Sequence, residues 1–352
     1  MEFKYSYPVD PSEYDDDGLC RGYPLRNHRD AELVDLGTLR AQENWRRLVG
    51  PLGIYKGGLG PKFNFVSLAL PECLPDRIEV IAYLNEMVFI HDDGVEDVSK
   101  QQGDELNDVL VDGFRLERIL SAQSVKNGKR KMQQDLVKKL VAIDKERALK
   151  AISSLTEYFA KGSGRRNHTE FRTLDEFMRY RILDVGKMYW VGCLTFAMAL
   201  TIPDDEMESL SELCHPAWLS CGLINDLYSW PKERDAAAKK GVGHVNNSVW
   251  VLMKEHKIDE TEAIARLRGR IRVCFVQHQQ KMKESNDRTD ISADVKRFME
   301  AMQYSMAANV VWSRSCPRYN EGRQFNERAR GDKVRAQTTA ASDKPYRKTR
   351  CE

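Results

Sequence analysis

The chain has 352 residues, 41% of them hydrophobic and 31% charged, a balance typical of a folded globular protein. Its formal net charge is only +2, which gives no reason to expect a nucleic-acid partner. No segment reaches the roughly 18 uninterrupted apolar residues that a membrane-spanning helix needs. The acidic N-terminus also lacks the basic-then-apolar pattern of a signal peptide, so we expect a cytoplasmic protein with no membrane span.

Apolar residues recur at helical spacing through most of the chain, and no run of alternating strands interrupts them. The clearest example is 131–161, which we expect to form a helix pair interrupted near Asp144. The other predicted helices cover residues 32–48, 75–97, 174–200, 204–230, 246–256, 260–283 and 291–312. This pattern predicts an all-α fold, built as one helical bundle from about residue 30 to 315.

Two segments outside the helices have distinctive compositions. The glycine-rich stretch 57–61 does not match a phosphate-binding loop, because no Lys-Ser/Thr pair follows it and no strand precedes it. Residues 326–352 are rich in arginine and lysine and almost empty of large apolar side chains. We expect this C-terminal segment to be a disordered tail or linker.

An acidic cluster, Asp-Asp-Gly-Val-Glu-Asp at residues 92–97, closes the apolar helix predicted over 75–97. Residues four apart on a helix share a face about 6 Å apart along the axis, so Asp92 and Glu96 point together, as do Asp93 and Asp97. Like charges placed this way repel unless a cation compensates them. Mg²⁺ fits this arrangement, because it takes one or two carboxylates and completes its shell with water and phosphate oxygens.

This cluster alone allows two other interpretations. An exposed helix end that happens to be acidic is equally consistent with the residues. The pair His91-Asp92 would also suit an HD-type phosphohydrolase, but that fold needs further His and Asp ligands, and the other histidines show no fitting pattern.

A second motif is more specific. Asn225, Ser229 and Glu233 follow one another at four-residue steps, which places three oxygen-bearing side chains on one helical face. Amide, hydroxyl and carboxylate oxygens together form a hard-oxygen metal site of low net charge. Pro231 lies inside the motif, and because proline lacks an N–H we expect the helix to end close to it.

Basic and hydroxyl side chains complete the polar set. Arg181 lies within an otherwise apolar segment, and Arg318 and Tyr319 follow the last predicted helix. Each has a plain alternative as a surface or ion-paired residue. A guanidinium fork that holds diphosphate oxygens is the functional interpretation of the arginines.

The order of these motifs resembles that of microbial class I terpene cyclases. Further stretches are similar to the cyclase half of fungal chimeric terpene synthases of the fusicoccadiene and ophiobolin F type. The resemblance covers residues 1 to 325, and its clearest segments are 71–73, 89–93, 225–235, 249–253 and 309–320.

The resemblance implies a class I terpenoid synthase helical bundle in which three Mg²⁺ ions join the enzyme to the diphosphate of an isoprenyl substrate. It makes Asp92 the main metal ligand of the first motif, with Asn225, Ser229 and Glu233 holding another ion. It also implies that Asp184 links Arg181 to a helix break at Val185 and Gly186. The residues that it places around the diphosphate are Arg181, Asn225, Lys232, Arg318 and Tyr319.

Two departures from the family pattern stand out. Glu96 occupies a position where aspartate is common. Chimeric members carry a second, prenyltransferase domain with two more aspartate-rich motifs, and none follows residue 320. The chain is therefore interpreted as either an excised cyclase domain or a stand-alone relative, and its assembly into homo-oligomers stays open.

The expected activity is that of a carbon–oxygen lyase, which cyclises a linear isoprenyl diphosphate, with the C20 substrate favoured and C25 next. The alternatives are a chain-elongating prenyl diphosphate synthase, which normally has two aspartate-rich motifs, and a non-catalytic helical scaffold. Aromatic faces would stabilise the carbocation. The candidates are Phe65, Phe89, Tyr189, Trp190, Phe196, Trp218 and Trp312, of which Phe65, Phe89 and Trp312 are preferred as catalytic.

Overall fold

The computed structural model describes residues 3–20, 22–96, 98–115, 127–167, 169–320 and 322. The predicted tail at 326–352 lies outside these residues. The helices are α1 (Ala31–Leu48), α2 (Phe65–Ala69), α3 (Ile78–Glu96), α4 (Lys100–Gly113), α6 (Gly128–Ile143), α7 (Lys145–Lys161), α8 (Leu174–Asp184), α9 (Lys187–Ala197), α10 (Met207–Leu213), α11 (His215–Lys240), α12 (Ser248–His256), α13 (Glu260–Asn286) and α14 (Ala293–Ser315). The predicted all-α class is confirmed.

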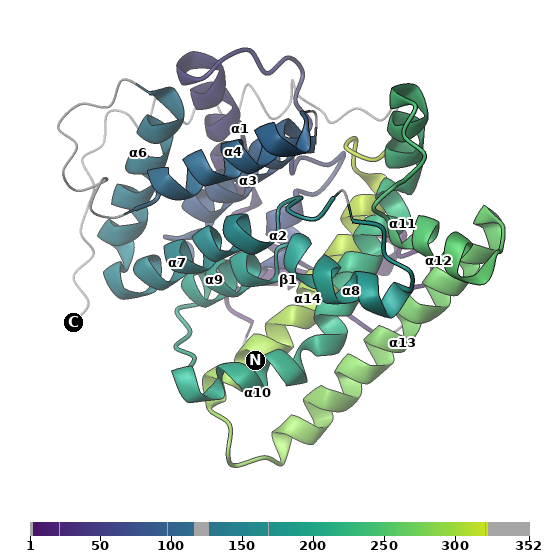
Figure 1. The fold of residues 1–352 in the computed structure, drawn as a ribbon. Helices are drawn as coiled ribbons and strands as arrows, with labels where there is room; N and C mark the ends of the chain where they lie inside the picture. The colour runs from purple at the N-terminus through teal and green to yellow at the C-terminus, as the bar shows by residue number, and fades with distance from the viewer. Residues whose placement is uncertain are drawn as a thin grey trace.

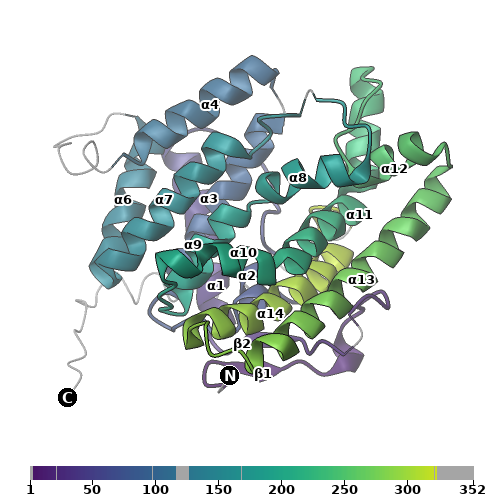
Figure 2. The same ribbon diagram turned by 60° about the horizontal axis from the view of Figure 1, so that its bottom comes forward.

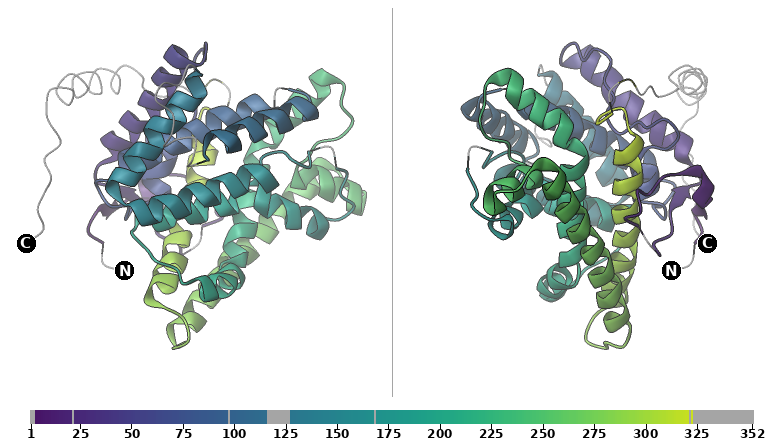
Figure 3. Two further views of the ribbon diagram at one scale, coloured as in Figure 1. Left: turned by 60° about the vertical axis from the view of Figure 1, so that its left-hand side comes forward. Right: turned by 90° about the vertical axis from the view of Figure 1, so that its right-hand side faces the viewer.

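The bundle contains two groups of helices, one packed on α3 and the other on α11 (Figure 1). On one side α1 and α4 pack against α3, and α6, α7 and α9 continue this layer. On the other side α12, α13 and α14 pack against α11. α13 and α14 form a long hairpin whose tip projects beyond the rest of the bundle (Figure 3). α3 buries most of its side chains between Ile78 and His91, as expected for a helix enclosed on all sides.

Several helix predictions are confirmed, while others misplace the ends of helices. The pair at 131–161 is present as α6 and α7, and Asp144 caps α7 by accepting a hydrogen bond from the Arg147 N–H. The helical segment predicted over 174–200 is divided into α8 and α9 at the break that the resemblance implies, because Gly186 has a φ of 94° that no helix interior allows. The segment 204–230 is likewise not one helix. It contains a 3-10 turn (Asp204–Glu206), α10 and the start of α11.

The expectation that a helix ends near Pro231 is wrong. α11 continues through Pro231 to Lys240 and ends at Gly241, whose left-handed backbone (φ 65°) closes the helix. Proline removes only one backbone hydrogen bond, and the residues before it, Leu227 and Trp230, are buried against the bundle. Tertiary packing therefore outweighs the local cost of the proline.

The short helix α2, the helix α4 and the strands β1 and β2 were not predicted. α4 begins with a capping box, in which Ser99 and Gln102 exchange hydrogen bonds. At the N-terminus, β1 (Ser6–Pro8) pairs antiparallel with β2 (Arg26–His28). This N-terminal segment runs along α13 and α14 in Figure 2, and Tyr23 Oη donates to the Phe275 carbonyl at 2.8 Å. The packed unit thus begins well before residue 30.

No helix within the described ranges has the length and apolar character to cross a membrane.

His278 on α13 gives a test of the packing between the two long helices. Its side chain is fully buried, and Nε2 lies 3.0 Å from the Met299 carbonyl oxygen, which can only accept. Nδ1 has no partner within the described ranges, so protonation there would bury an unsatisfied N–H. Burial lowers the pKa of His278 from 6.5 to about 4.

Below pH 6.5 His278 is therefore protonated in the unfolded chain but stays neutral in the folded protein. Its contribution to the free energy of unfolding is lost as pH falls towards 4. We expect the free energy of unfolding to lose about 2 kcal/mol at pH 5 from this residue. His278→Gln keeps a donor for the Met299 carbonyl but cannot titrate. Urea denaturation should show that wild type loses its advantage over the variant between pH 7 and 5, and a difference independent of pH would contradict this assignment.

Candidate active site

One pocket lies between α3, α8, α9, α11 and α14, with α2 beside them. Its empty volume, including the part that is open to solvent, is about 1280 Å³. The pocket is lined by every site residue predicted from the sequence, namely Phe65, Phe89, Asp92, Arg181, Asp184, Asn225, Ser229, Lys232, Glu233, Trp312, Arg318 and Tyr319.

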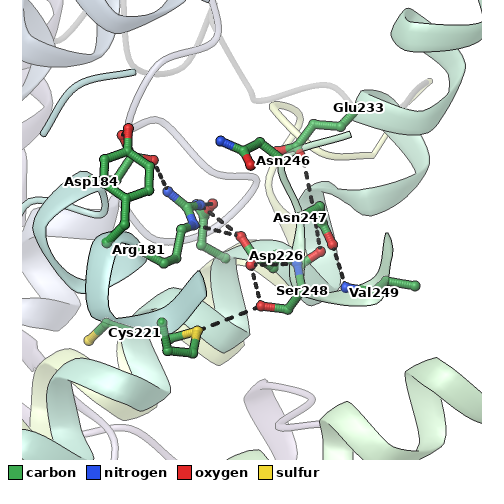
Figure 4. Close-up of polar contacts among 12 residues, drawn as sticks. Arg181, Asp184, Cys221, Asp226, Glu233, Asn246, Asn247, Ser248 and Val249 are labelled. Carbon is green, nitrogen blue, oxygen red and sulfur yellow. Dashed lines mark hydrogen bonds and ion pairs between the residues drawn. The ribbon is translucent and has the colours of Figure 1, made fainter. Parts of the chain in front are cut away.

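Arg181 is the centre of the polar network in this pocket (Figure 4). Its Nη1 donates to Asp184 Oδ2 at 2.6 Å, and its Nη2 donates to Asn225 Oδ1 at 2.6 Å. Its Nε donates to Asp226 Oδ1 at 2.8 Å. All three guanidinium nitrogens thus donate a hydrogen bond, and these bonds fix the orientation of the group.

Asp184 joins Arg181 to the break between α8 and α9. Its Oδ1 accepts from the Gly164 N–H and from Tyr180 Oη, both at 2.7 Å, while Oδ2 binds Arg181. The helix break lies at Val185 and Gly186, where the resemblance had placed it.

Asp226 is a central residue to which the sequence analysis gave no role. Its side chain is fully buried, and Oδ2 accepts from the Ser248 N–H at 2.9 Å and from Ser248 Oγ at 2.5 Å. Because Oδ1 binds Arg181, this carboxylate ties α8, α11 and α12 together. Asn247, next to Ser248, is the N-cap of α12, and its side chain accepts from the Val249 N–H.

The two adjacent aspartates of α3 have opposite surroundings. Both terminal nitrogens of the Arg318 guanidinium donate to the Asp93 carboxylate, at 2.6 and 2.7 Å, and Tyr55 Oη donates to it at 2.7 Å. Lys232 Nζ lies 3.7 Å from Asp93 Oδ1. By contrast, the Asp92 side chain lines the pocket and makes no hydrogen bond or salt bridge within the part of the chain that the structure describes.

These surroundings shift the pKa values in opposite directions. Burial raises the pKa of Asp93, but the charge and hydrogen bonds of Arg318, the charge of Lys232 and the Tyr55 hydrogen bond together outweigh it, and the pKa lies below its usual range. For Asp92, burial and the neighbouring Glu96 carboxylate both raise the pKa. Burial, together with the charges of Asp226 and Glu96, raises the pKa of Glu233 to about 7. The pocket therefore contains carboxylates that lack a compensating positive charge.

The second motif lies along α11 as its spacing predicts. Asn225 Nδ2 donates to Tyr319 Oη at 2.9 Å, and Glu233 Oε2 accepts from Asn247 Nδ2 at 2.9 Å. Ser229 Oγ is buried and has no hydrogen-bond partner among the described residues. Buried hydroxyls are nearly always satisfied, so this oxygen is available for a further ligand.

These residues fit a hard divalent cation. The available atoms are an unpaired carboxylate on Asp92 and an amide, a hydroxyl and a carboxylate on α11, all of them oxygens. Within the described ranges, no three His, Cys, Asp or Glu side chains group closely enough to hold a metal by themselves. The protein ligands would thus need water or phosphate oxygens to complete a coordination shell, which is the usual condition of Mg²⁺.

Aromatic side chains form another wall of the same pocket. Phe65 packs against Phe89, Trp190 and Trp312, with ring centroids 6.2, 5.6 and 5.2 Å away. Of the seven aromatic residues considered from the sequence, Phe196 is the one that does not line the pocket. It is fully buried beneath the Arg77 guanidinium, because α9 turns that face towards the core.

His91, the residue that allowed a phosphohydrolase interpretation, does not line the pocket. Its Nε2 lies 2.8 Å from Asn107 Oδ1 on α4, and its ring is buried against Phe159. The histidine is therefore a packing residue between α3, α4 and α7.

Comparison with known proteins agrees with this arrangement. The chain matches the model for terpene synthase family 2, C-terminal metal binding, over residues 83–277, which include both predicted metal motifs. A bifunctional type I diterpene synthase from Aspergillus flavipes is 43% identical over 331 residues, covering 93% of this chain and 43% of that protein. Fusicoccadiene synthase from Phomopsis amygdali is 42% identical over 334 residues, covering 93% and 46%.

Ophiobolin F synthase from Aspergillus clavatus is 43% identical over 329 residues, covering 93% of this chain and 45% of that protein. The chain thus spans less than half the length of these relatives. Among solved structures, aristolochene synthase from Penicillium roqueforti superposes with a TM-score of 0.66 over 80% of this chain and 95% of that one, at 21% identity. The expected terpenoid synthase bundle is confirmed by this fold, and the match across both motifs shows that the chain belongs to terpene synthase family 2.

Proposed function

We propose that this chain is a magnesium-dependent class I terpene cyclase, which ionises a linear isoprenyl diphosphate and closes the resulting carbocation into rings. The observation that carries the proposal is the lining of one pocket by two chemically different sets of residues. Asp92, the α11 motif and basic residues form one set, and contacting aromatic rings form the other.

The basic residues are the groups that would bind and orient the diphosphate. Arg318 and Lys232 pair with Asp93 in the absence of ligand, so their charges already converge on the pocket. Arg181 stays locked by Asp184 and Asp226, and Tyr319 Oη shares a hydrogen bond with Asn225. A fixed set of donors stabilises a leaving anion without needing to reorganise during the reaction.

We infer that three Mg²⁺ ions act as cofactor, with Asp92 as a ligand from α3 and Asn225, Ser229 and Glu233 as ligands from α11. When bound, the metal would neutralise charge on the departing diphosphate. The unpaired carboxylate of Asp92 and the unsatisfied Ser229 Oγ support this assignment. Asn225 Oδ1 already accepts from Arg181, and its second lone pair remains for a cation.

The aromatic wall would then control the carbocation. Phe65, Phe89 and Trp312 offer π faces that stabilise a positive charge by about 0.5 to 2 kcal/mol each, whereas a lone pair in the same place would quench it. Because this wall is apolar, it also excludes water, which would otherwise capture the cation.

Geranylgeranyl diphosphate, with 20 carbons, is the favoured substrate, since relatives at 42–43% identity are named diterpene and fusicoccadiene synthases. The C25 homologue is the alternative, because a bifunctional sesterterpene synthase is 42% identical.

We further propose that residues 1–325 form the cyclase domain. Because relatives named as bifunctional enzymes are more than twice the matched length, a prenyltransferase domain in the full-length protein is part of this proposal.

Replacing a metal ligand should abolish ionisation. We expect Asp92→Asn and Glu233→Ala each to lower diphosphate release by about 10²-fold to 10³-fold or more, because charge that develops on the leaving group loses its stabilisation. Far-UV circular dichroism should remain that of wild type. Asp204→Asn is the matched control, as its side chain is 97% exposed and distant from the pocket lining. Undiminished turnover in both pocket variants would refute the metal assignment.

A second experiment separates the cyclase from a chain-elongating synthase. Wild-type protein is incubated with Mg²⁺ and a single C15, C20 or C25 allylic diphosphate, without isopentenyl diphosphate, and the products are identified by mass spectrometry. We expect cyclic hydrocarbon, most of it from the C20 substrate. A requirement for isopentenyl diphosphate, with a longer diphosphate as product, would support the synthase instead.

A further inference from the structure

The glycine-rich stretch 57–61 has no part in the polar site, yet its Gly58 peptide contacts the aromatic wall directly. The Gly58 carbonyl accepts two hydrogen bonds, one from the Phe65 N–H and one from Trp312 Nε1, both at 3.0 Å. The Gly58 N–H donates to Glu86 Oε2 at 2.8 Å. A single residue, through the two peptide groups that flank its Cα, therefore connects two wall residues, from α2 and α14, to a carboxylate on α3.

Glu86 is an unusual residue to find in this place. Its side chain is fully buried, and its Oε1 accepts from Gln42 Nε2 at 2.6 Å. No salt bridge to it is present among the described residues, and burial raises its pKa to about 7. An apolar side chain of similar size would fill the space without the cost of burying a carboxyl group. Its presence therefore points to a role that an apolar residue could not perform.

The glycines allow this contact by their lack of a side chain. Gly57 has a φ of 48°, and a Cβ there would lie 1.8 Å from Glu86 Oε1. At Gly60 a Cβ would lie 2.3 Å from the Phe63 carbonyl oxygen. Only glycine at position 57 lets this loop approach α3 so closely, and only glycine at position 60 fits against the Phe63 carbonyl.

The rings that the loop holds form one contiguous group. Phe65 and Trp312 have centroids 5.2 Å apart, and Phe89 lies 6.2 Å from the first and 6.0 Å from the second. Phe89 follows Glu86 by three residues on α3, so the carboxylate and this ring move as one rigid element. A shift of the Gly58 peptide would displace Phe65 and Trp312 relative to Phe89.

We propose that Glu86 is a positioning residue, which fixes the aromatic wall through the Gly58 peptide and so determines which cyclisation route the carbocation follows. This inference rests on the proposed function. Glu86 precedes Asp92 by six residues, about 9 Å along the helix, so it acts on the hydrocarbon part of the substrate and not on the diphosphate. Its loss should change the product ratio far more than the rate of ionisation.

The test compares Glu86→Met, which removes the acceptor, with Glu86→Gln, which keeps one. Glu72→Gln is the matched control, because Glu72 is also buried and accepts from Ser6 Oγ and the Lys4 N–H, but lies outside the pocket lining. With geranylgeranyl diphosphate, we expect Glu86→Met to lower the ratio of main product to side products by about fivefold or more. Diphosphate release should stay within about threefold of wild type. Glu86→Gln should restore most of the ratio, and Glu72→Gln should leave it unchanged.

A spectroscopic readout makes the test independent of catalysis. The indole ¹H–¹⁵N resonance of Trp312, assigned by its disappearance in Trp312→Phe, should shift and exchange faster with solvent in Glu86→Met but not in Glu72→Gln. If wild type releases no diphosphate, the proposed function fails, and this resonance still decides whether Glu86 positions the wall. If Glu86→Met does not fold, Gln42→Met removes a donor to the same carboxylate and should cause a smaller shift in the same direction. An unchanged resonance and product ratio in the folded variant, or an equal change in Glu72→Gln, would overturn the proposal.

Discussion

The buried ion pair between Arg181 and Asp226 is the interaction on which the site depends. Asp226 is fully buried on α11, and its two oxygens bind Arg181 on α8 and Ser248 at the start of α12. Removing one partner of such a pair leaves an uncompensated charge in the interior, which typically costs about 3 to 5 kcal/mol. The pair fixes the relative positions of α8 and α11, and it thereby places Asn225 and Asp184 on opposite edges of one guanidinium.

The proposed reaction sets two conflicting requirements. Ionisation needs charged groups, while a carbocation survives only where water and nucleophiles are excluded. α3 would meet both, because it places Phe89 in the aromatic wall and Asp92 one turn further along, among the charged groups. In our account a second buried carboxylate on this helix, Glu86, organises the wall through a backbone peptide. Helix α3 would thus connect the charged groups that promote ionisation to the aromatic wall as one rigid element.

The metal motifs could be predicted from the sequence because helical spacing alone places Asn225, Ser229 and Glu233 on one face. Their convergence with Asp92 on one pocket came from the resemblance and not from periodicity. Asp226 was missed, because a buried partner for an arginine on another helix has no local signature. Local rules also failed at Pro231, where packing overrides the preference of proline. Phe196 shows the same limit, since an aromatic residue on a buried helix can face either the pocket or the core.

We propose above all that the acidic motif of α3 and the Asn225, Ser229 and Glu233 motif of α11 bind divalent ions around one diphosphate. It can be tested most directly by crystallography with inorganic diphosphate and Mn²⁺, whose anomalous scattering locates each ion. We expect peaks beside Asp92 and beside Ser229 and Glu233, joined by oxygens of the same diphosphate. Peaks confined to other surfaces, or a diphosphate bound in the pocket without any metal between it and these residues, would contradict it.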